Sequence, residues 1–185
     1  QALQKSIKET KQRHEDWSEK KIRETAEKII IGAIKFEMIK VSADQTITFD
    51  IDQALKFDGF TAAYLQYVYA RIQSIIKKSK IQNPNVKSNS KSKCQNINFT
   101  EKQEHELIIK LAKYPEVIIR AGENYNPAEV AKYLFELAQE FNEYYHKVQI
   151  LKAEEKIMAA RLALIDSVSK VIKNGLNLLG IQTME

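Results

Sequence analysis

The segment from Phe57 to Ile75 places aromatic and cationic side chains on one face of a predicted helix. Tyr64, Tyr67, Arg71 and Lys78 follow one another at intervals of three, four and seven residues, which bring side chains to the same face of an α-helix. Aromatic rings can stack on unpaired bases, and guanidinium and ammonium groups can bind phosphates. A separate apolar stripe consists of Leu65, Val68, Ile72 and Ile75. We therefore expect a helix that packs on one side and contacts RNA on the other.

The distribution of charge supports a nucleic-acid surface. The chain has a net charge of +5, and the stretch between Gly59 and Thr100 contains no Asp or Glu. The cations of this stretch are Arg71, Lys77, Lys78, Lys80, Lys87, Lys91 and Lys93. A cationic segment beside tyrosines is the electrostatic pattern of a nucleic-acid surface.

Each of these features also has a structural interpretation. Tyr64 and Tyr67 could close a contact between two helices, and Arg71 could pair with a carboxylate. The lysines could belong to a solvated loop that keeps the protein soluble.

Other kinds of site find little support in the sequence. The single cysteine, Cys94, excludes an intrachain disulfide, and His14, His105 and His146 have no metal-ligand spacing, so we predict no metal site. No glycine-rich phosphate loop or catalytic triad is present, and we expect the carboxylates on solvated helix faces and no catalytic residues. Without a signal-peptide pattern or an apolar run of roughly 18 to 20 residues, the chain reads as cytoplasmic.

The scarcity of helix breakers predicts an all-α fold, since the chain has only five glycines and three prolines. We expect one helix over 16–30, a break at Gly32, a short helix over 33–39, and a strand or extended link over 46–51. Five helices should follow Asp58. The first covers 61–80, and a long polar loop around Ser88 precedes the second.

Local signals predict where the later helices begin and end. The second should start with a capping box at Thr100–Gln103, the third with Pro115 and the fourth with Asn126 and Pro127. The last should begin near Ala153 and end at a glycine cap, Asn174-Gly175. The predicted buried positions of the last two helices are Ala131, Leu134, Ala138, Phe141, Tyr145, Ile157, Ala160, Leu164, Val168 and Val171.

Four sequence blocks resemble one protein family. The Phe57-Asp58-Gly59 segment, continuing through Tyr64-Leu65-Gln66-Tyr67 to Ala70-Arg71, is similar to the start of the anticodon-binding domain of arginyl-tRNA synthetases. The blocks at 106–118, 133–145 and 160–181 follow in the family's order. The resemblance implies a helical anticodon-binding bundle over 58–185. Residues 1–57 would be a short mixed segment from the end of the catalytic domain.

The resemblance also implies a function and a set of partners. The chain would bind the anticodon loop of an arginine tRNA and join a missing N-terminal catalytic domain, which would use ATP with Mg²⁺ to ligate arginine to the tRNA. The His-Ile-Gly-His motif that holds ATP is absent, so this part would itself lack the ATP and arginine site. We expect a monomer. The implied tRNA contacts are Tyr64, Tyr67, Arg71, Lys78, Asn142, Tyr145 and Arg161.

Two alternatives remain open at this point. The chain could be the helical domain of another class I synthetase, such as the cysteinyl enzyme, or a helical protein-interaction scaffold without an RNA role. Tyr145 also falls on the predicted core stripe and could be a packing residue.

Overall fold

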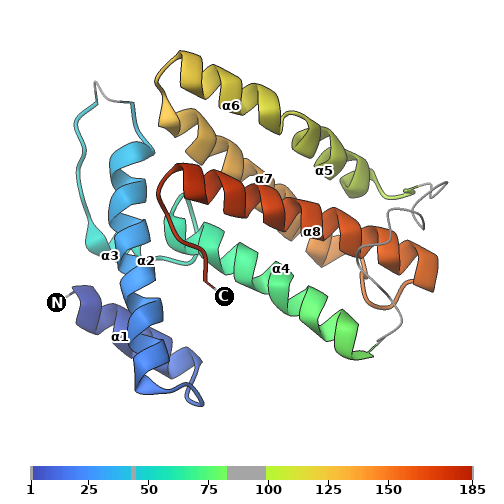
Figure 1. Cartoon of the computed structure of the whole chain (residues 1–185), viewed down its shortest axis with the longest axis horizontal. Helices are drawn as coiled ribbons and strands as arrows, with labels where there is room; N and C mark the ends of the chain where they lie inside the picture. The colour runs from blue at the N-terminus through green and yellow to red at the C-terminus, as the bar shows by residue number, and fades with distance from the viewer. Residues whose placement is uncertain (1, 43–44, 83–98, 185) are drawn as a thin grey trace.

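The computed structural model describes residues 2–42, 45–82 and 99–184, and these residues form helices and connecting segments without a β-strand. The all-α prediction is confirmed (Figure 1). The helices are α1 (Ala2–Arg13), α2 (Glu19–Ile39), α3 (Ile51–Ala54), α4 (Ala62–Gln82), α5 (Lys102–Ala112), α6 (Tyr114–Glu123), α7 (Pro127–Lys147) and α8 (Glu155–Leu178).

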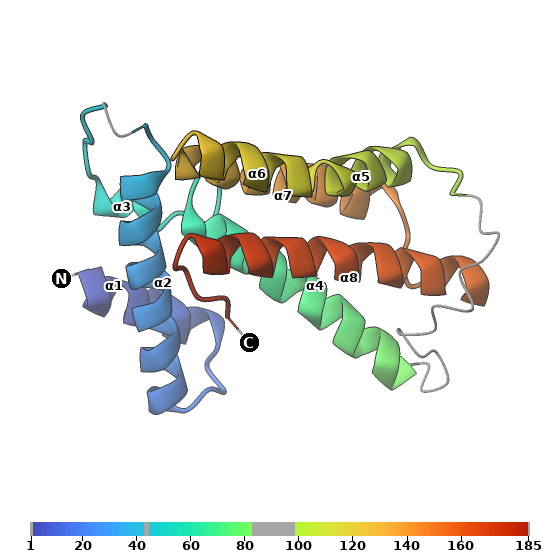
Figure 2. The ribbon, with the colours of Figure 1, turned by 45° about the horizontal axis from the view of Figure 1, so that its top comes forward.

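Helices α4 to α8 form an elongated bundle. Helix α8 packs against both α4 and α7, while the shorter α5 and α6 follow one another along α7 (Figures 1 and 2). Helix α2 crosses one end of this bundle and contacts α4 and α7, and α1 packs against α2. The α1–α2 pair therefore projects beside α4.

The predicted apolar stripes form most of the core. Leu65, Val68, Ile72 and Ile75 of α4 are all buried, as are Ala131, Leu134, Ala138 and Phe141 of α7 and Ala160, Leu164 and Val168 of α8. Two predicted core positions are wrong. Ile157 is exposed because it lies in the first turn of α8, and on α7 the fully buried tyrosine is Tyr144, while Tyr145 is 36% exposed.

Two glycines that were expected to interrupt or end helices lie inside them. Gly32 is buried within α2, where a Cβ atom would come within 3.0 Å of Gln66 Nε2. Gly175 is buried within α8, where a Cβ atom would come within 2.6 Å of Leu134 Cδ2. Both glycines allow close helix packing. After α8 ends, the glycine with a left-handed conformation is Gly180, at a φ of 70°, and Gly59 before α4 has a φ of 82°.

The other predicted boundaries are partly correct. Pro115 and Pro127 lie in the first turns of α6 and α7, as expected. The capping box of α5 is displaced by one residue from the prediction, because Glu101 is the N-cap and Glu104 accepts a hydrogen bond from the Glu101 backbone N–H at 3.1 Å. Residues 46–50 form an extended link. The polar stretch around Ser88, with Cys94, lies outside the described residues.

Helix α2 shares its core with the bundle. Phe36 of α2 is fully buried and meets Phe60 edge-on, with 5.1 Å between ring centroids. The buried Gln66 side chain of α4 donates a hydrogen bond to the Gln182 carbonyl at 2.7 Å and so holds the C-terminal segment in the same place. The division at residues 57 and 58 stays a prediction, and packing across it is continuous.

Candidate nucleic-acid interface

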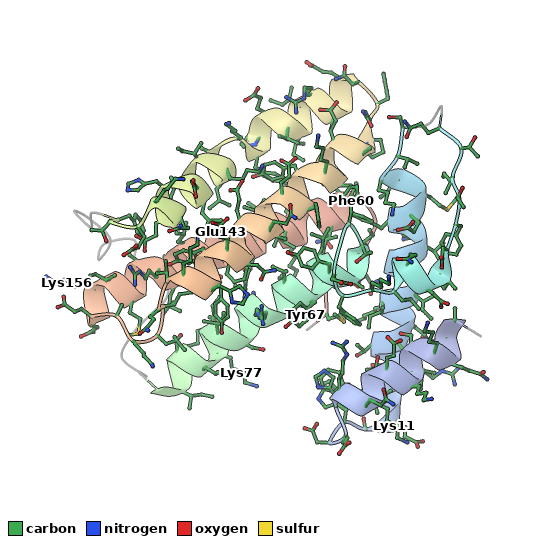
Figure 3. The ribbon with its side chains drawn as sticks, turned by 180° about the vertical axis from the view of Figure 1, so that it is seen from behind. Lys11, Phe60, Tyr67, Lys77, Glu143 and Lys156 are labelled. Carbon is green, nitrogen blue, oxygen red and sulfur yellow. The ribbon has the colours of Figure 1, made fainter. Side chains whose placement is uncertain are left out.

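A cleft of about 1100 Å³ lies between the α1–α2 pair on one side and α4 with the α7–α8 connection on the other. We call it the basic cleft. Figure 3 shows Tyr67 and Lys77 on α4, with α1 lying across from Tyr67. Among the described residues that line it there is no Asp or Glu. Its cations are Arg13, Lys21, Arg71, Lys77, Lys78 and Lys152, and its aromatic residues outside the histidines are Trp17, Phe57, Tyr67 and Tyr145.

One side of the basic cleft is formed by α4, the end of α7 and the α7–α8 connection, and we call it the α4 wall. Arg71 lies in this wall between two aromatic rings. Its guanidinium carbon lies 5.1 Å from the ring centroid of Tyr67 and 5.1 Å from that of Tyr145. These distances are typical of cation–π contacts. One guanidinium nitrogen, Nη1, also donates a long hydrogen bond of 3.4 Å to the Asn142 side-chain oxygen. Within the described residues Arg71 makes no other side-chain hydrogen bond, so its remaining N–H groups can donate to a ligand.

Asn142 is oriented by the residue behind it. Its amide nitrogen donates to the Tyr64 hydroxyl at 2.7 Å, which turns the amide oxygen toward Arg71. Tyr64 is only 9% exposed and packs against Phe135, and this burial raises the pKa of its phenol. Tyr64 therefore lies behind the α4 wall, and Asn142 connects Tyr64 to Arg71 by hydrogen bonds.

Aromatic and cationic groups continue from α4 toward α1. The Phe57 ring meets Tyr67 edge-on at 6.3 Å, and the Arg13 guanidinium lies over Phe57 at 4.2 Å. The contacts thus run without interruption from Arg13 on α1 through Phe57 and Tyr67 to Arg71. This series of ring and cation–π contacts joins the two walls of the basic cleft.

The turn between α1 and α2 carries a second cluster, which we call the α1–α2 corner (residues 13–21). His14 stacks on Trp17 with 3.8 Å between ring centroids, and the Lys21 ammonium lies 3.9 Å from the centre of the same indole. Trp17 therefore holds two polar side chains beside the cleft.

Five of the seven predicted RNA contacts come together at the α4 wall. Tyr67, Arg71 and Tyr145 line the basic cleft, as does Lys78 further along α4, and Asn142 contacts Arg71. Tyr145, which the core stripe had suggested as a packing residue, faces this cleft instead. Tyr64 lies buried behind Asn142.

Arg161 lies apart from these residues, in a buried ion pair. Its Nε atom is 2.7 Å from Glu104 Oε1, and the two side chains are 10% and 1% exposed. A second guanidinium nitrogen donates to the Gln149 carbonyl at 3.1 Å, in the connection that lines the cleft. The expectation that carboxylates lie on solvated faces is wrong for Glu104, because Arg161 compensates its charge inside the protein.

The sequence interpretation missed the far wall of the cleft. Arg13, Trp17 and Lys21 follow one another at intervals of four residues, but they fall in a segment that was assigned to the end of another domain. The non-helical turn that separates α1 from α2 brings them together. Phe57 was read as part of a family motif and not as a ring that joins Arg13 to Tyr67.

The described part of the chain offers neither a cluster of metal ligands nor a membrane-spanning helix. Within residues 2–42, 45–82 and 99–184, no three His, Cys, Asp or Glu side chains are grouped as metal ligands. None of the helices described there is long and apolar enough to cross a membrane.

Comparison with known proteins identifies the family of most of this chain, including the residues of the α4 wall. Residues 65–185 match the sequence profile of a family described as "DALR anticodon binding domain", so the match covers more than half of the chain. The chain belongs to the DALR anticodon binding domain family. The DALR match includes Tyr67, Arg71, Lys78, Asn142 and Tyr145, whereas Tyr64 and the α1–α2 corner precede it.

The relatives of this DALR chain are much longer proteins. It is 37% identical over its full length to an arginine–tRNA ligase from Thermococcus kodakarensis, of which it spans 29%. It is 41% identical over 167 residues to an arginine–tRNA ligase from Pyrococcus abyssi, of which it spans 26%.

Solved structures of arginyl-tRNA synthetases share the fold of this chain. All of the chain superposes on Thermus thermophilus arginyl-tRNA synthetase with a TM-score of 0.83 and 28% identity, covering 30% of that protein. The Plasmodium falciparum arginyl-tRNA synthetase gives a TM-score of 0.85 and 26% identity, with 32% of it covered. The resemblance to arginyl-tRNA synthetases seen in the four sequence blocks is confirmed.

Proposed function

We propose that this chain is the anticodon-binding part of an arginine–tRNA ligase and binds the anticodon loop of an arginine tRNA in the basic cleft. The observation that carries the proposal is Arg71, held between Tyr67 and Tyr145 in a cleft whose described lining has no carboxylate. A cationic lining attracts the phosphates of an RNA backbone, and exposed aromatic rings can stack on unpaired bases.

The polar groups at Arg71 suit recognition of cytosine. Arginine codons share guanine at the middle position, so their tRNAs have cytosine at the centre of the anticodon. The pairing edge of cytosine presents two acceptors, O2 and N3, next to an amino donor. Arg71 supplies N–H donors and the Asn142 amide oxygen is an acceptor, while Tyr145 offers exposed ring area for stacking.

The rest of the ligase would lie outside these residues. We assign ATP, Mg²⁺ and the arginine site to the catalytic part, because the relatives are more than three times as long as this chain. Helix α2 carries exposed Ile31, Ile34 and Met38 at helical spacing, a stripe on which that part could dock. The cytoplasmic location and the monomeric state stay predictions.

Substitutions at the two rings test the proposal. Stacking on an aromatic side chain contributes about 1 to 3 kcal/mol per base, so Tyr67→Ala and Tyr145→Ala should each weaken binding of an arginine-tRNA anticodon stem-loop about 5- to 150-fold. Tyr125→Ala is the matched control, because Tyr125 is 93% exposed in the turn between α6 and α7, outside the cleft lining. Circular dichroism would verify folding. Equal affinities for all three folded variants and the unmodified chain would refute the proposal.

A further inference from the structure

We propose that the α1–α2 corner is a second RNA-binding wall, which holds backbone phosphates of the strand whose base enters the α4 wall. This inference rests on the proposed function, since it extends the same cleft. It concerns Arg13, His14 and Lys21, which precede the part of the chain that matches the DALR family.

The first argument is the charge of these side chains. Arg13 and Lys21 line the basic cleft, and within the part of the chain that the structure describes neither side chain forms an ion pair with a carboxylate. Their contacts are with ring faces, namely Phe57 for Arg13 and Trp17 for Lys21. Glu15, Asp16 and Glu19 belong to the same corner but are absent from the cleft lining. Inside the cleft, therefore, no described lining carboxylate compensates Arg13 and Lys21.

The second argument is that the corner is held in place. Helix α1 is joined to the segment before α4 by the Lys5–Asp52 ion pair at 2.6 Å, and Ser6 donates to the Ala26 carbonyl of α2. At the other end of α1, Arg13 is held by Phe57, which itself contacts Tyr67. Both walls thus belong to one packed unit, and a ligand would meet cations that are already positioned.

The third argument concerns the chemistry of the ligand. His14 and the Lys21 ammonium both lie over the Trp17 indole, so this ring positions two polar groups and has little face left for a base. A point charge such as the Lys21 ammonium suits a phosphate. The α4 wall, in contrast, supplies the rings and the amide that suit a base.

The fourth argument is the size of the cleft. Its volume of about 1100 Å³ lies at the upper limit of the range of about 300 to 1,000 Å³ that is usual for small-molecule pockets, so the cleft has room for more than one nucleotide. On the α4 side, Lys77, Lys78 and Lys152 continue the positive lining beyond Arg71. A strand of several nucleotides, with phosphates against both walls, matches this shape and charge.

The test removes two cations from the corner and compares the result with a matched loss of charge elsewhere. The double variant Arg13→Gln/Lys21→Gln would be compared with Lys113→Gln/Lys132→Gln, which removes two exposed cations that lie outside the corner and the cleft lining and form no ion pair among the described residues. Each 185-residue protein would be titrated with a fluorescent arginine-tRNA anticodon stem-loop between 50 and 300 mM KCl, about the range over which such contacts are screened. Circular dichroism would verify that both variants fold.

Each phosphate contact to a single strand contributes a slope of about −0.7 in log K against log salt. We expect the corner variant to reduce the steepness of this slope by about 1.4, and the control variant to reduce it much less. The preference for the native central anticodon base should persist in the corner variant.

The outcomes separate the two proposals. Identical slopes for the corner variant and the control variant would overturn the phosphate-binding corner, even if the unmodified chain prefers the native anticodon. An unmodified chain without that preference would refute base recognition instead. In that case a slope difference between the two variants would still support phosphate binding at the corner.

Discussion

The buried ion pair between Arg161 and Glu104 leads to the sharpest prediction about stability. Arg161→Met keeps most of the side chain's apolar volume and removes its charge, which leaves the Glu104 carboxylate buried without its cation. Breaking a buried pair in this way costs about 3 to 5 kcal/mol. The hydrogen bond to the Gln149 carbonyl is lost as well. We therefore expect the free energy of unfolding to fall by about 3 to 5 kcal/mol.

The effect can be measured by urea unfolding at pH 7, followed by circular dichroism at 222 nm. For a protein of this size the same loss corresponds to a midpoint about 6 to 20 °C lower in thermal unfolding. Lys147→Met is the matched control, because Lys147 pairs with Glu143 on the surface, where both side chains are more than half exposed. An exposed pair is worth about 0.2 to 1 kcal/mol.

A second variant tests the physical reason. Arg161→Met/Glu104→Gln removes both charges together, and replacing a complete buried pair is often close to neutral, so it should recover most of the lost stability. A loss below about 1 kcal/mol in Arg161→Met would refute the reasoning, since the pair would then behave like a surface pair. We also expect the affinity of the double variant for the anticodon stem-loop to stay within about threefold of that of the unmodified chain. A larger loss of affinity in a fully folded protein would show that Arg161 contributes to RNA binding, as the family resemblance implied.

Three further substitutions test the packing. Gly175→Ala should lower the free energy of unfolding by up to about 2 kcal/mol in urea unfolding. Its Cβ would lie 2.6 Å from a terminal methyl of the fully buried Leu134, and overpacking of about 1 to 3 kcal/mol outweighs the gain of about 1 kcal/mol in helix propensity; increased stability would contradict this close contact. Tyr144→Phe should leave stability equal or higher in thermal unfolding, because among the described residues no group hydrogen-bonds its buried hydroxyl, and a clear decrease would indicate a hidden partner. Burial raises the pKa of the Glu140 carboxyl above its ordinary value, and Lys110 partly offsets this effect. Because the folded state then holds the proton more tightly than the unfolded state, the free energy of unfolding falls as the pH rises from the ordinary pKa through the raised one. Glu140→Gln should therefore be more favourable for stability at pH 7 than at pH 4 in parallel urea titrations, and the reverse order would contradict the sign of the shift.

The local patterns of the sequence predicted much of the fold. The α4 stripe was correct because a 3.6-residue period places its members unambiguously on one face. At the end of α7 the same period admits either Tyr144 or Tyr145, and the contact between Tyr145 and Arg71 of another helix decides which one faces the cleft. Composition likewise could not distinguish a helix-breaking glycine from Gly32 or Gly175, which make room for neighbouring side chains.

The candidate site was predicted only where its residues share a helix or a family block. Tyr67 and Arg71 are four residues apart on α4, so their proximity follows from helix geometry. The far wall could not be predicted in this way, because Arg13 meets Phe57 only after α1 folds back along α2. Glu104 and Arg161, which lie 57 residues apart, likewise show no local sign of their pairing.

The most direct measurement of base recognition is a titration of the unmodified 185-residue chain with two anticodon stem-loops that differ only in the central base. One would carry the native cytosine and the other uracil, each at two salt concentrations. A set of polar contacts to a base edge discriminates by about 1 to 3 kcal/mol, so we expect the native loop to bind about 5- to 150-fold more tightly. This preference should persist at the higher salt while both affinities fall. Equal affinities for the two loops at both salt concentrations would contradict the proposal that this cleft recognises the anticodon.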